Sequence, residues 1–400
     1  MKTKLWFKYL LFIYILAISS WEYFYRVSNT AVYLLFPIAL FLSVYYRKRI
    51  NTGVLFLLPF VAIFISQVIL YSIPYHFPIT LFVRLFTIYL VASIIGKELI
   101  YITINSIKFI AVISLVFYVL LHFDFTNNLF LQLSENFNNL GSMPETVVDW
   151  PNFMIYTITP KPDDFFLYRN SGPFREPGLY VIFLNIALFL NMLLTREIIN
   201  KINFVLVVSV ISTFSTTGYL VILLIFLFFI GTSKKLSIIK KVIMLIFVLG
   251  LIPIVYSLPF VGDKIQEQST QSDISYSRFG AFLVHLNILR DFPLTGLPYD
   301  NTTYFNYADN ISPNGISEVF IRFGYVVGFY YYYLLFRSSQ FITQNIGYRR
   351  IGFYLFLVIF TSLFSQTVGT SPIILLFVFS QFSLINNYKL GNYKSIRKSV

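Results

Sequence analysis

Apolar runs of nearly membrane-spanning length recur along this 400-residue chain and constrain its fold more than any other feature. A helix needs about 20 apolar residues to cross a bilayer. In lipid, every backbone amide and carbonyl must be paired within the protein, which favours helices. Charged residues make up only 12% of the chain, against roughly 25% in soluble domains. The sequence therefore predicts an all-α polytopic membrane protein, with residues 1–400 forming a single integral membrane domain.

The basic residues predict how the chain is oriented. We expect twelve spans, at residues 5–21, 30–46, 53–72, 79–95, 104–122, 178–194, 202–214, 217–232, 242–258, 316–336, 351–368 and 371–386. Lysines and arginines cluster after the even-numbered spans and at both ends, so the positive-inside rule makes both termini cytoplasmic. The long polar segments 123–177 and 259–315 then face outward as two large extracytoplasmic loops. The net charge of +13 is orientation charge, and no nucleic-acid partner is expected.

Two span assignments need their own argument. Residues 202–232 could form one long helix, but the lysines that follow would then lie outside, against the rule. A break at residues 215–218 (STTG) restores the expected orientation, and we place this break near the outer face, close to the candidate site. The first apolar run lacks a small-residue cleavage site, so we expect a retained helix and no signal peptide.

The supply of metal ligands and nucleophiles is small. The chain has no cysteine, which excludes disulfides and thiolate chemistry, and it has three scattered histidines, His76, His122 and His285. This composition argues against a zinc site, and we expect neither a metal nor a cofactor. His285 is a possible base because histidine titrates near neutrality. As a lone histidine on an amphipathic stretch, it is more simply explained as structural, like the other two.

Residues 169–180 (RNSGPFREPGLY) join the first polar segment to an apolar run and predict an anion site. The guanidinium fork of arginine suits phosphate oxygens, and Arg169 and Arg175 would converge on one ligand if the segment turns. Glu176 precedes a proline near a helix start, where free amides also favour an anion. The alternative is that Arg175 pairs with Glu176 or nearby carboxylates, or contacts lipid headgroups.

The second polar segment contains an amphipathic stretch at residues 276–291, which we expect to lie at the membrane interface or to cap the helices. Its apolar residues at helical spacing are Phe279, Phe282, Leu283, Leu286 and Leu289. Arg278 opens this stretch and is either a further anion contact or an arginine that snorkels from the interface.

Ionisable residues also lie inside predicted spans. Residues 312–315 (SPNG) precede a span that carries Glu318 and Arg322, whose i, i+4 spacing allows a pair on one helix face. Arg84 lies in the fourth span and could pair with a carboxylate or form part of a cavity. Ionisable residues within a membrane are functional-site candidates by default, so the structural and the functional explanations both stay open.

Several segments together resemble the O-antigen polymerases of the Wzy type and their O-antigen ligase relatives. They are residues 169–180, 212–218 (STFSTTG), 277–279 (SRF) with 291–296 (DFPLTG), and 312–315 with 324–328 (GYVVG). The resemblance covers the central 40% of the chain, and the N-terminal third matches only in topology. Many relatives, notably ligases, have a histidine before the asparagine equivalent to Asn314. Here Pro313 occupies that position, so the ligase base is missing.

The resemblance implies a metal-independent, inverting glycosyltransferase at the outer face of the bacterial cytoplasmic membrane. It would polymerise undecaprenyl-diphosphate-linked oligosaccharide repeat units into O-antigen, capsule or exopolysaccharide. Glu176 and Glu318 are the candidate bases. The remaining candidates bind substrate: Arg169, Arg175 and Arg278 the diphosphate, and Asn314, Arg322 and Arg84 other parts.

The implied partners are the lipid-linked oligosaccharide, the bilayer, a flippase and a chain-length regulator. Three alternatives stay open. The missing histidine disfavours an O-antigen ligase, and the one-sided polar loops disfavour a flippase or transporter of lipid-linked oligosaccharide. A non-catalytic scaffold or chain-length regulator would not need arginines at several membrane borders.

Overall fold

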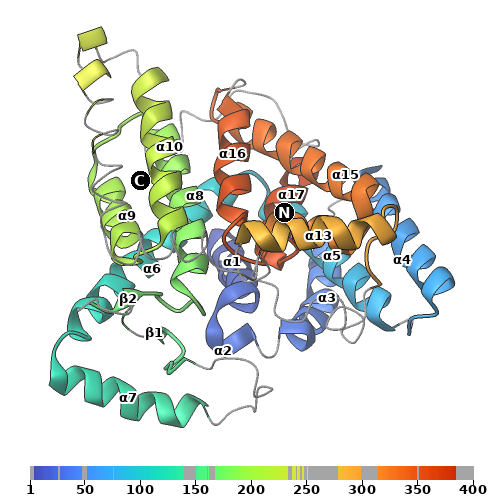
Figure 1. Ribbon diagram of the computed structural model, residues 1–400, viewed down its shortest axis with the longest axis horizontal. Helices are drawn as coiled ribbons and strands as arrows, with labels where there is room; N and C mark the ends of the chain where they lie inside the picture. The colour runs from blue at the N-terminus through green and yellow to red at the C-terminus, as the bar shows by residue number, and fades with distance from the viewer. Residues whose placement is uncertain are drawn as a thin grey trace.

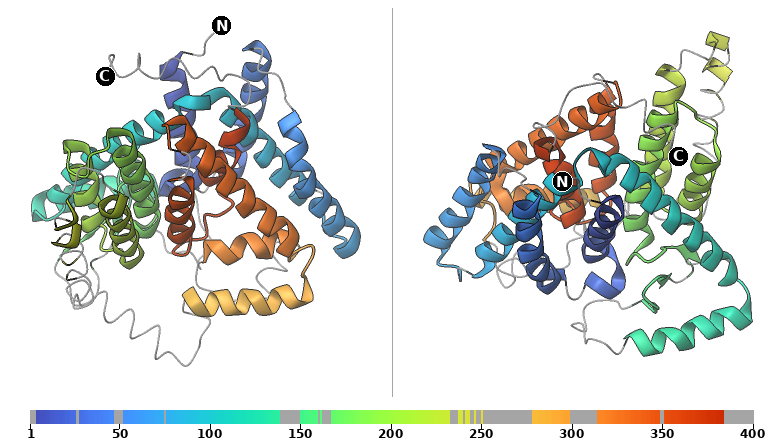
Figure 2. Two further views of the ribbon diagram at one scale, coloured as in Figure 1. Left: turned by 90° about the horizontal axis from the view of Figure 1, so that it is seen from above. Right: turned by 180° about the vertical axis from the view of Figure 1, so that it is seen from behind.

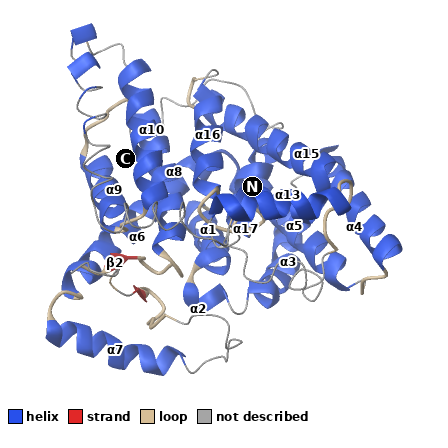
Figure 3. Cartoon of the chain, viewed as in Figure 1, coloured by secondary structure: helices blue, strands red, loops and turns tan. Residues whose placement is uncertain are grey.

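The structure is a computed structural model dominated by helices (Figures 1 and 3). It describes residues 4–25, 28–46, 52–74, 76–138, 150–159, 161, 167–232, 237–239, 241–243, 246, 250, 278–298, 314–348 and 351–383. The N-terminal half contains α1 (Leu5–Ser20), α2 (Glu22–Tyr25), α3 (Ser28–Tyr45), η1 (Thr52–Leu57), α4 (Leu58–Tyr71), α5 (His76–Ile95), η2 (Gly96–Glu98), α6 (Leu99–Leu120) and α7 (Asp124–Asn138). After strands β1 (Ile158–Thr159) and β2 (Arg169–Asn170) follow α8 (Pro177–Thr195), α9 (Lys201–Ser212), α10 (Thr216–Thr232), α13 (Arg278–Asp291), α15 (Gly315–Asn345), α16 (Gly352–Leu363), α17 (Pro372–Phe379) and η5 (Ser380–Ser383).

The described part of the chain includes four helical stretches that are long and apolar enough to cross a membrane: Val54–Tyr71, Ile79–Leu120, Pro177–Thr195 and Gly315–Asn345. The second comprises 42 residues, about twice what one crossing needs, and η2 divides it with Gly96 at φ +65°. The remaining apolar helices are shorter. The chain is therefore an all-α protein with helices of membrane-spanning length.

Helices lie over every predicted span except 242–258, most of which lies outside the described residues. The division of residues 202–232 is confirmed, because α9 ends at Ser212 and α10 begins at Thr216. The break lies slightly earlier than the STTG motif, with Phe214 at φ +47°. Most of the predicted loop 259–315 also lies outside the described residues.

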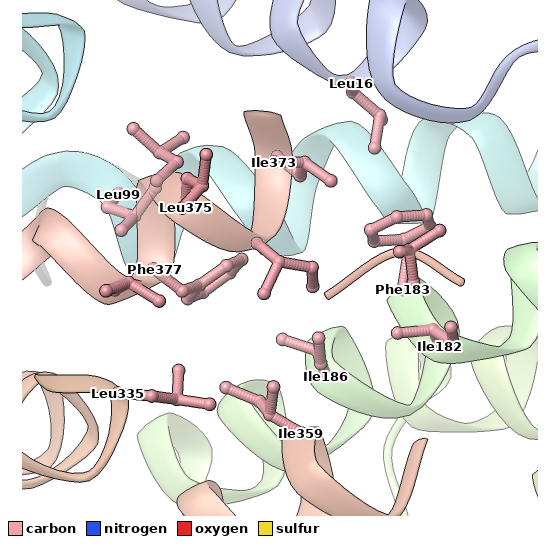
Figure 4. Packing of buried hydrophobic residues seen from close by; sticks show 14 of the residues in the cluster. Leu16, Leu99, Ile182, Phe183, Ile186, Leu335, Ile359, Ile373, Leu375 and Phe377 are labelled. Atoms are coloured by element: carbon pink, nitrogen blue, oxygen red, sulfur yellow. The ribbon is translucent and has the colours of Figure 1, made fainter. Parts of the chain in front are cut away.

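Helix α8 lies at the centre of the packing. It contacts α6, α9, α10 and α16, and every residue from Pro177 to Leu193 is buried. Figure 4 shows its side chains Ile182, Phe183 and Ile186 meeting side chains of α1, α15, α16 and α17. Since lipid is as apolar as these side chains, close van der Waals packing, rather than escape from water, holds such helices together.

Helix α15 is broken at Gly324, whose φ of +71° and ψ of 176° are non-helical. The break leaves a carbonyl and an amide without helical partners. A loop at residues 293–297 supplies both, because Leu297 N donates to Ile321 O (2.7 Å) and Tyr325 N donates to Pro293 O (2.8 Å). The buried amide of Gln67 on α4 fastens this loop by donating to Thr295 O (2.8 Å) and Arg322 O (3.2 Å). Two segments of the family resemblance, 291–296 and 324–328, thus pack together.

The first polar segment, 123–177, contains more regular structure than its sequence suggested. Helix α7 occupies its start and runs along one edge of the molecule, beyond the β1–β2 pair (Figure 1). The two strands are antiparallel, with Ile158 opposite Asn170 and Thr159 opposite Arg169. Phe130 of α7 packs with Phe153 and Tyr156 in a separate aromatic cluster. This cluster fixes α7 and the strands against the end of α6.

Helix α13 confirms the helix expected at residues 276–291 and runs alongside the start of α15 (Figure 2, left). Its predicted apolar face is partly wrong. Leu283 is 38% exposed, whereas Ala281, His285 and Ile288 are buried. Residues three or four apart lie on the same side of a helix, so these buried residues form one face of α13. This face packs against α15. His285 therefore lies in the packed face.

Candidate functional site

The segment before α8 is anchored to the junction of α1 and α2. Trp21 and Phe174 form an isolated antiparallel bridge. Glu22 N donates to Pro173 O (3.3 Å), and Arg175 N donates to Ser20 O (3.1 Å). These backbone bonds bring the Arg175 guanidinium to the buried carboxylate of Glu22, with Nε and Oε2 3.7 Å apart. Arg175 thus pairs with a carboxylate distant in sequence rather than with its neighbour Glu176.

Arg169 contacts the break between α9 and α10. Its guanidinium donates to the carbonyls of Thr213 and Phe214, both at 3.3 Å. The adjacent Asn170 is fully buried and donates to Ser212 Oγ (2.9 Å). The expected proximity of the 169–180 segment to this break is confirmed. Arg169 and Arg175 have different protein partners, so these contacts do not reveal a shared ligand.

Glu176 stands at the start of α8. It is the N-cap residue, and its carbonyl accepts from the amides of Leu179 and Tyr180. Its half-buried side chain accepts a hydrogen bond from Nε2 of Gln366 to Oε2 (2.8 Å). Gln366 lies between α16 and α17. The carboxylate of Glu176 is therefore held from a part of the chain 190 residues away.

The start of α15 is a second polar centre. The side chain of Asn314 caps the helix by accepting from the amides of Ile316 (3.1 Å) and Ser317 (3.2 Å). Glu318 is 3% exposed, and its Oε1 accepts from Arg322 Nε (2.8 Å). The predicted i, i+4 pair is thus present. The same oxygen accepts from Thr370 Oγ1 (3.2 Å), while Oε2 is buried without a hydrogen-bond partner.

The loop at residues 365–371 connects these two centres, since it carries both Gln366 and Thr370. It fits closely between the helix starts. A Cβ at Gly178 would lie 2.6 Å from Gln366 Nε2, and one at Gly369 would lie 2.6 Å from Gly315 O. A Cβ at Gly315 would collide with the backbone of Gln366. Glycine at positions 315 and 369 lets α15 and the loop meet at backbone distance, and Gly178 leaves room on α8 for the side chain of Gln366.

His285 is buried at the contact of α13 with α15. Its Nδ1 lies 2.7 Å from Ser317 Oγ, and its Nε2 has no hydrogen-bond partner. Burial lowers the pKa of His285 to about 4, because the apolar surroundings disfavour the charged imidazolium. The residue is neutral near pH 7, in agreement with its structural interpretation.

The remaining predicted residues are less well defined. Arg278 is the first residue of α13, and its side chain is not part of the structure that is described. Arg84 is half-buried in α5, which packs against α3 and α17. His122 is exposed, with Nδ1 2.8 Å from Tyr118 O, whereas the side chain of His76 lies outside the description.

Sequence reasoning missed several residues of these centres. Glu22, Gln366 and Thr370 each contact a predicted site residue. The polar run 365–371 (SQTVGTS) was visible as a break between two apolar runs. The predicted spans 351–368 and 371–386 take in most of this run, although polar residues inside predicted spans are functional-site candidates.

No family model matches the chain, and no curated protein matches it either. The chemistry must therefore be argued from the residues. In the described part of the chain, no group of three or more His, Asp and Glu side chains is arranged to hold a metal ion. The assembled groups are two carboxylates, Glu176 and Glu318, each accompanied by an arginine. Such a set can accept a proton and stabilise an anion.

Proposed function

We propose that this protein polymerises undecaprenyl-diphosphate-linked oligosaccharide repeat units at the outer face of the bacterial cytoplasmic membrane. The observation that carries the proposal is the meeting of family-like segments that are far apart in sequence. Segment 169–180 contacts the 212–218 break, and segment 291–296 packs on the break at Gly324. Glu318 is joined to Glu176 through the 365–371 loop, and Gly315, directly after Asn314, packs against the backbone of that loop.

In the proposed reaction, the growing glycan is transferred from its lipid diphosphate to a hydroxyl of a new lipid-linked repeat unit. The bond between the anomeric carbon and the diphosphate oxygen breaks, and its electron pair leaves with the diphosphate. The acceptor oxygen attacks the opposite face, which inverts the anomeric configuration. Glu176 takes the hydroxyl proton, while arginines stabilise the charge on the leaving group.

The two carboxylates differ in solvent exposure, and on this basis we assign them different roles. Glu176 is half-buried, whereas Glu318 is 3% exposed and already accepts two hydrogen bonds on one oxygen. A base must reach the proton that it removes, which favours Glu176. Glu318 instead holds Arg322, whose side chain is 29% exposed, where it can face an anion. Arg169, Arg175 and Arg278 remain the proposed diphosphate contacts.

A lipid-linked substrate also needs an apolar surface for its hydrocarbon chain. The helices α4 and α5 border an apolar groove of this character, lined by Val61, Phe64, Ile65, Val68, Ile69, Ile79 and Phe82. Two lipid-anchored substrates confined to one membrane are already restricted in position. That restriction lowers the entropic cost of bringing donor and acceptor together.

The proposal includes the orientation: twelve spans, both termini cytoplasmic, and segments 123–177 and 259–315 outside. Because the chain has no cysteine, single cysteines can be introduced without background. Cysteine at Asn138 or Thr302 should react with an impermeant thiol reagent in intact cells or spheroplasts, and cysteine at Ser237 should not. Labelling only at position 237 would invert the orientation and move the site to the cytoplasmic face.

Reconstitution tests the reaction itself. Purified protein in liposomes, supplied with its native lipid-linked repeat units and a chelator, should produce a ladder of longer glycans. Glu176→Gln should slow ladder formation about 100- to 10,000-fold, as expected for loss of a general base, while leaving the protein folded and a residual rate measurable. Translocation of the lipid-linked unit without a ladder would favour the flippase alternative. Transfer of finished glycan to a different acceptor would favour the ligase.

A further inference from the structure

We infer that the 365–371 loop is the positioning element of the site, with Gln366 orienting Glu176 and Thr370 orienting Glu318. This inference rests on the proposed function, and it assigns roles to two residues with no place in that reaction so far. Both side chains are 5% exposed, so they act through the carboxylates that they contact.

The Gln366 contact fixes one oxygen of the proposed base. Gln366 Nε2 donates to Oε2 of Glu176 at 2.8 Å. A carboxylate held through one oxygen has a restricted rotamer, and its second oxygen, Oε1, can then be directed at the acceptor hydroxyl. A general base works only within hydrogen-bond reach of its proton. Loss of the amide would let Glu176 rotate, and productive geometry would become rarer.

The Thr370 contact adds a second donor to one oxygen of the second carboxylate. Oε1 of Glu318 accepts from Thr370 Oγ1 at 3.2 Å and from Arg322 Nε at 2.8 Å. One donor belongs to the loop and the other to α15, so together they fix the orientation of the carboxylate. A fixed Glu318 in turn fixes the guanidinium of Arg322. Thr370 thus orients the arginine indirectly, through Glu318.

The packing of the loop makes this arrangement rigid. The close approaches at Gly178, Gly315 and Gly369 leave no space for the loop to slide between the helix starts. The hydroxyl of Tyr331 donates to Gly369 O, and Tyr332 donates to Ile316 O (2.9 Å). Gln366 and Thr370 lie on the same short loop. The loop therefore couples the two carboxylates into one unit.

Matched substitutions separate positioning from simple packing. Thr370→Val removes the hydroxyl at nearly constant volume, and Thr370→Ser retains it. Thr367 lies in the same loop but is exposed, so Thr367→Val is the matched control. We expect Thr370→Val and Gln366→Leu each to lower kcat about 10- to 100-fold, as expected for loss of a hydrogen bond to a charged group. Thr370→Ser should recover most of the rate, and Thr367→Val should resemble the wild type.

A double-mutant cycle supplies the decisive measurement, with glycan ladder formation from native lipid-linked repeat units as the assay. If Gln366 acts through Glu176, then Gln366→Leu should cause little further loss in a Glu176→Gln background. Thr370→Val should likewise add little to Glu318→Gln. Thermal unfolding is measured for every variant, because a merely structural role would lower stability and leave the rate effects additive. Gln366→Met, which keeps the length of the side chain and removes the donor without adding a charge, replaces Gln366→Leu if the latter does not fold.

The outcomes distinguish this inference from the proposed function. A wild-type protein that forms no ladder from its native substrate overturns the polymerase proposal and the positioning role with it. A wild type that polymerises, with additive cycles or with equal effects of Thr370→Val and Thr367→Val, overturns only the positioning role. Rescue by Thr370→Ser together with non-additive cycles supports both.

Discussion

The starts of α8 and α15 differ in how their charged groups are used. Each helix begins just after a polar residue and meets the 365–371 loop. At α8, Arg175 is 23% exposed and Glu176 is half-buried, so a ligand can reach both. At α15, Asn314 and Glu318 are 0% and 3% exposed, and their oxygens accept hydrogen bonds from the protein itself. A ligand can therefore reach both charged side chains at α8, whereas at α15 only Arg322, whose side chain is 29% exposed, is open to one.

The two helices also differ along their length. Helix α8 is uninterrupted and pairs its own backbone groups, as a helix in an apolar environment must. Helix α15 breaks at Gly324 and depends on residues 293–297 for two backbone hydrogen bonds. The geometry of α15 thus requires contacts between distant parts of the chain. Substitutions at α15 should first affect stability, and substitutions before α8 should first affect rate.

The largest effect is expected at Gly324. Its φ of +71° with ψ near 180° is accessible essentially only to glycine. A Cβ there would also collide with the carbonyl of Leu294. We expect Gly324→Ala to cost at least about 3 kcal/mol and to yield little folded protein, as measured by detergent-solubilised yield and thermal unfolding. Gly231→Ala in α10 is the matched control, since nothing lies within 4 Å of its Cβ position. Equal stability of the two variants would show that α15 is not broken in this way.

Substitution of Arg175 should affect the rate, and Arg175→Ala should also lower the stability, because the buried carboxylate of Glu22 loses this partner. Loss of a charge-assisted contact to the leaving diphosphate costs on the order of 3 kcal/mol, or roughly 100-fold in polymerisation rate. Arg175→Lys keeps a positive charge near Glu22 but lacks the planar fork. It should therefore stay folded and still polymerise slowly. Arg290→Ala removes an exposed arginine from the end of α13 and serves as the control. Normal polymer from Arg175→Ala would remove this residue from the mechanism.

His285 should make stability depend on pH. The unfolded pKa of histidine is about 6.5, and burial lowers that of His285 to about 4. Between these values the unfolded chain binds more protons, so stability falls as the pH decreases from 6.5 toward 4. Above pH 6.5 this contribution is fully present. The loss between pH 6.5 and 5 should be roughly 2 kcal/mol.

The pH dependence is tested by thermal unfolding of wild type, His285→Gln and His122→Gln. Only His285→Gln should flatten the profile between pH 5 and 6.5, because His122 is exposed. A flat wild-type profile would mean that His285 is accessible to water, in which case its role as a buried partner of Ser317 is wrong. The sign also matters for activity assays, since a loss of rate in mild acid could reflect unfolding at α13 rather than titration of the base.

Local sequence signals predicted the helices but not the contacts between them. Apolar runs predicted the helices α8 and α15, and the positive-inside rule predicted the break before α10. The i, i+4 spacing of Glu318 and Arg322 predicted their pair. By contrast, Glu22 meets Arg175 only because residues 20–22 bridge to residues 173–175. Gln366 reaches Glu176 because a loop near the end of the chain lies between two helix starts.

The amphipathic segments also show that sequence signals do not predict contacts between helices. Helix α7 was missed although Phe125, Leu129 and Leu133 recur at helical spacing, because its many asparagines resemble a loop. All three residues are exposed, and Phe130 carries the packing. In α13 the packed face includes His285 and excludes Leu283. Periodicity identifies an apolar face, but the shape of the neighbouring helix selects which residues are buried.

We expect the smallest effect at Asn314. Its effect can be compared with that of Asn200, which caps another helix in the same way. Asn200 caps α9 by accepting from Asn203 N at 2.9 Å, as Asn314 caps α15. Replacing a capping asparagine by alanine costs typically about 1 kcal/mol. We expect Asn314→Ala and Asn200→Ala to lower the stability by similar amounts. Asn314→Asp keeps the accepting oxygen and should preserve most of the stability.

If Asn314 only caps the helix, the Asp variant should also polymerise at the wild-type rate. If its amide instead contacts the sugar, Asn314→Asp should polymerise more slowly at unchanged stability, and the start of α15 would join that of α8 as a substrate-binding surface.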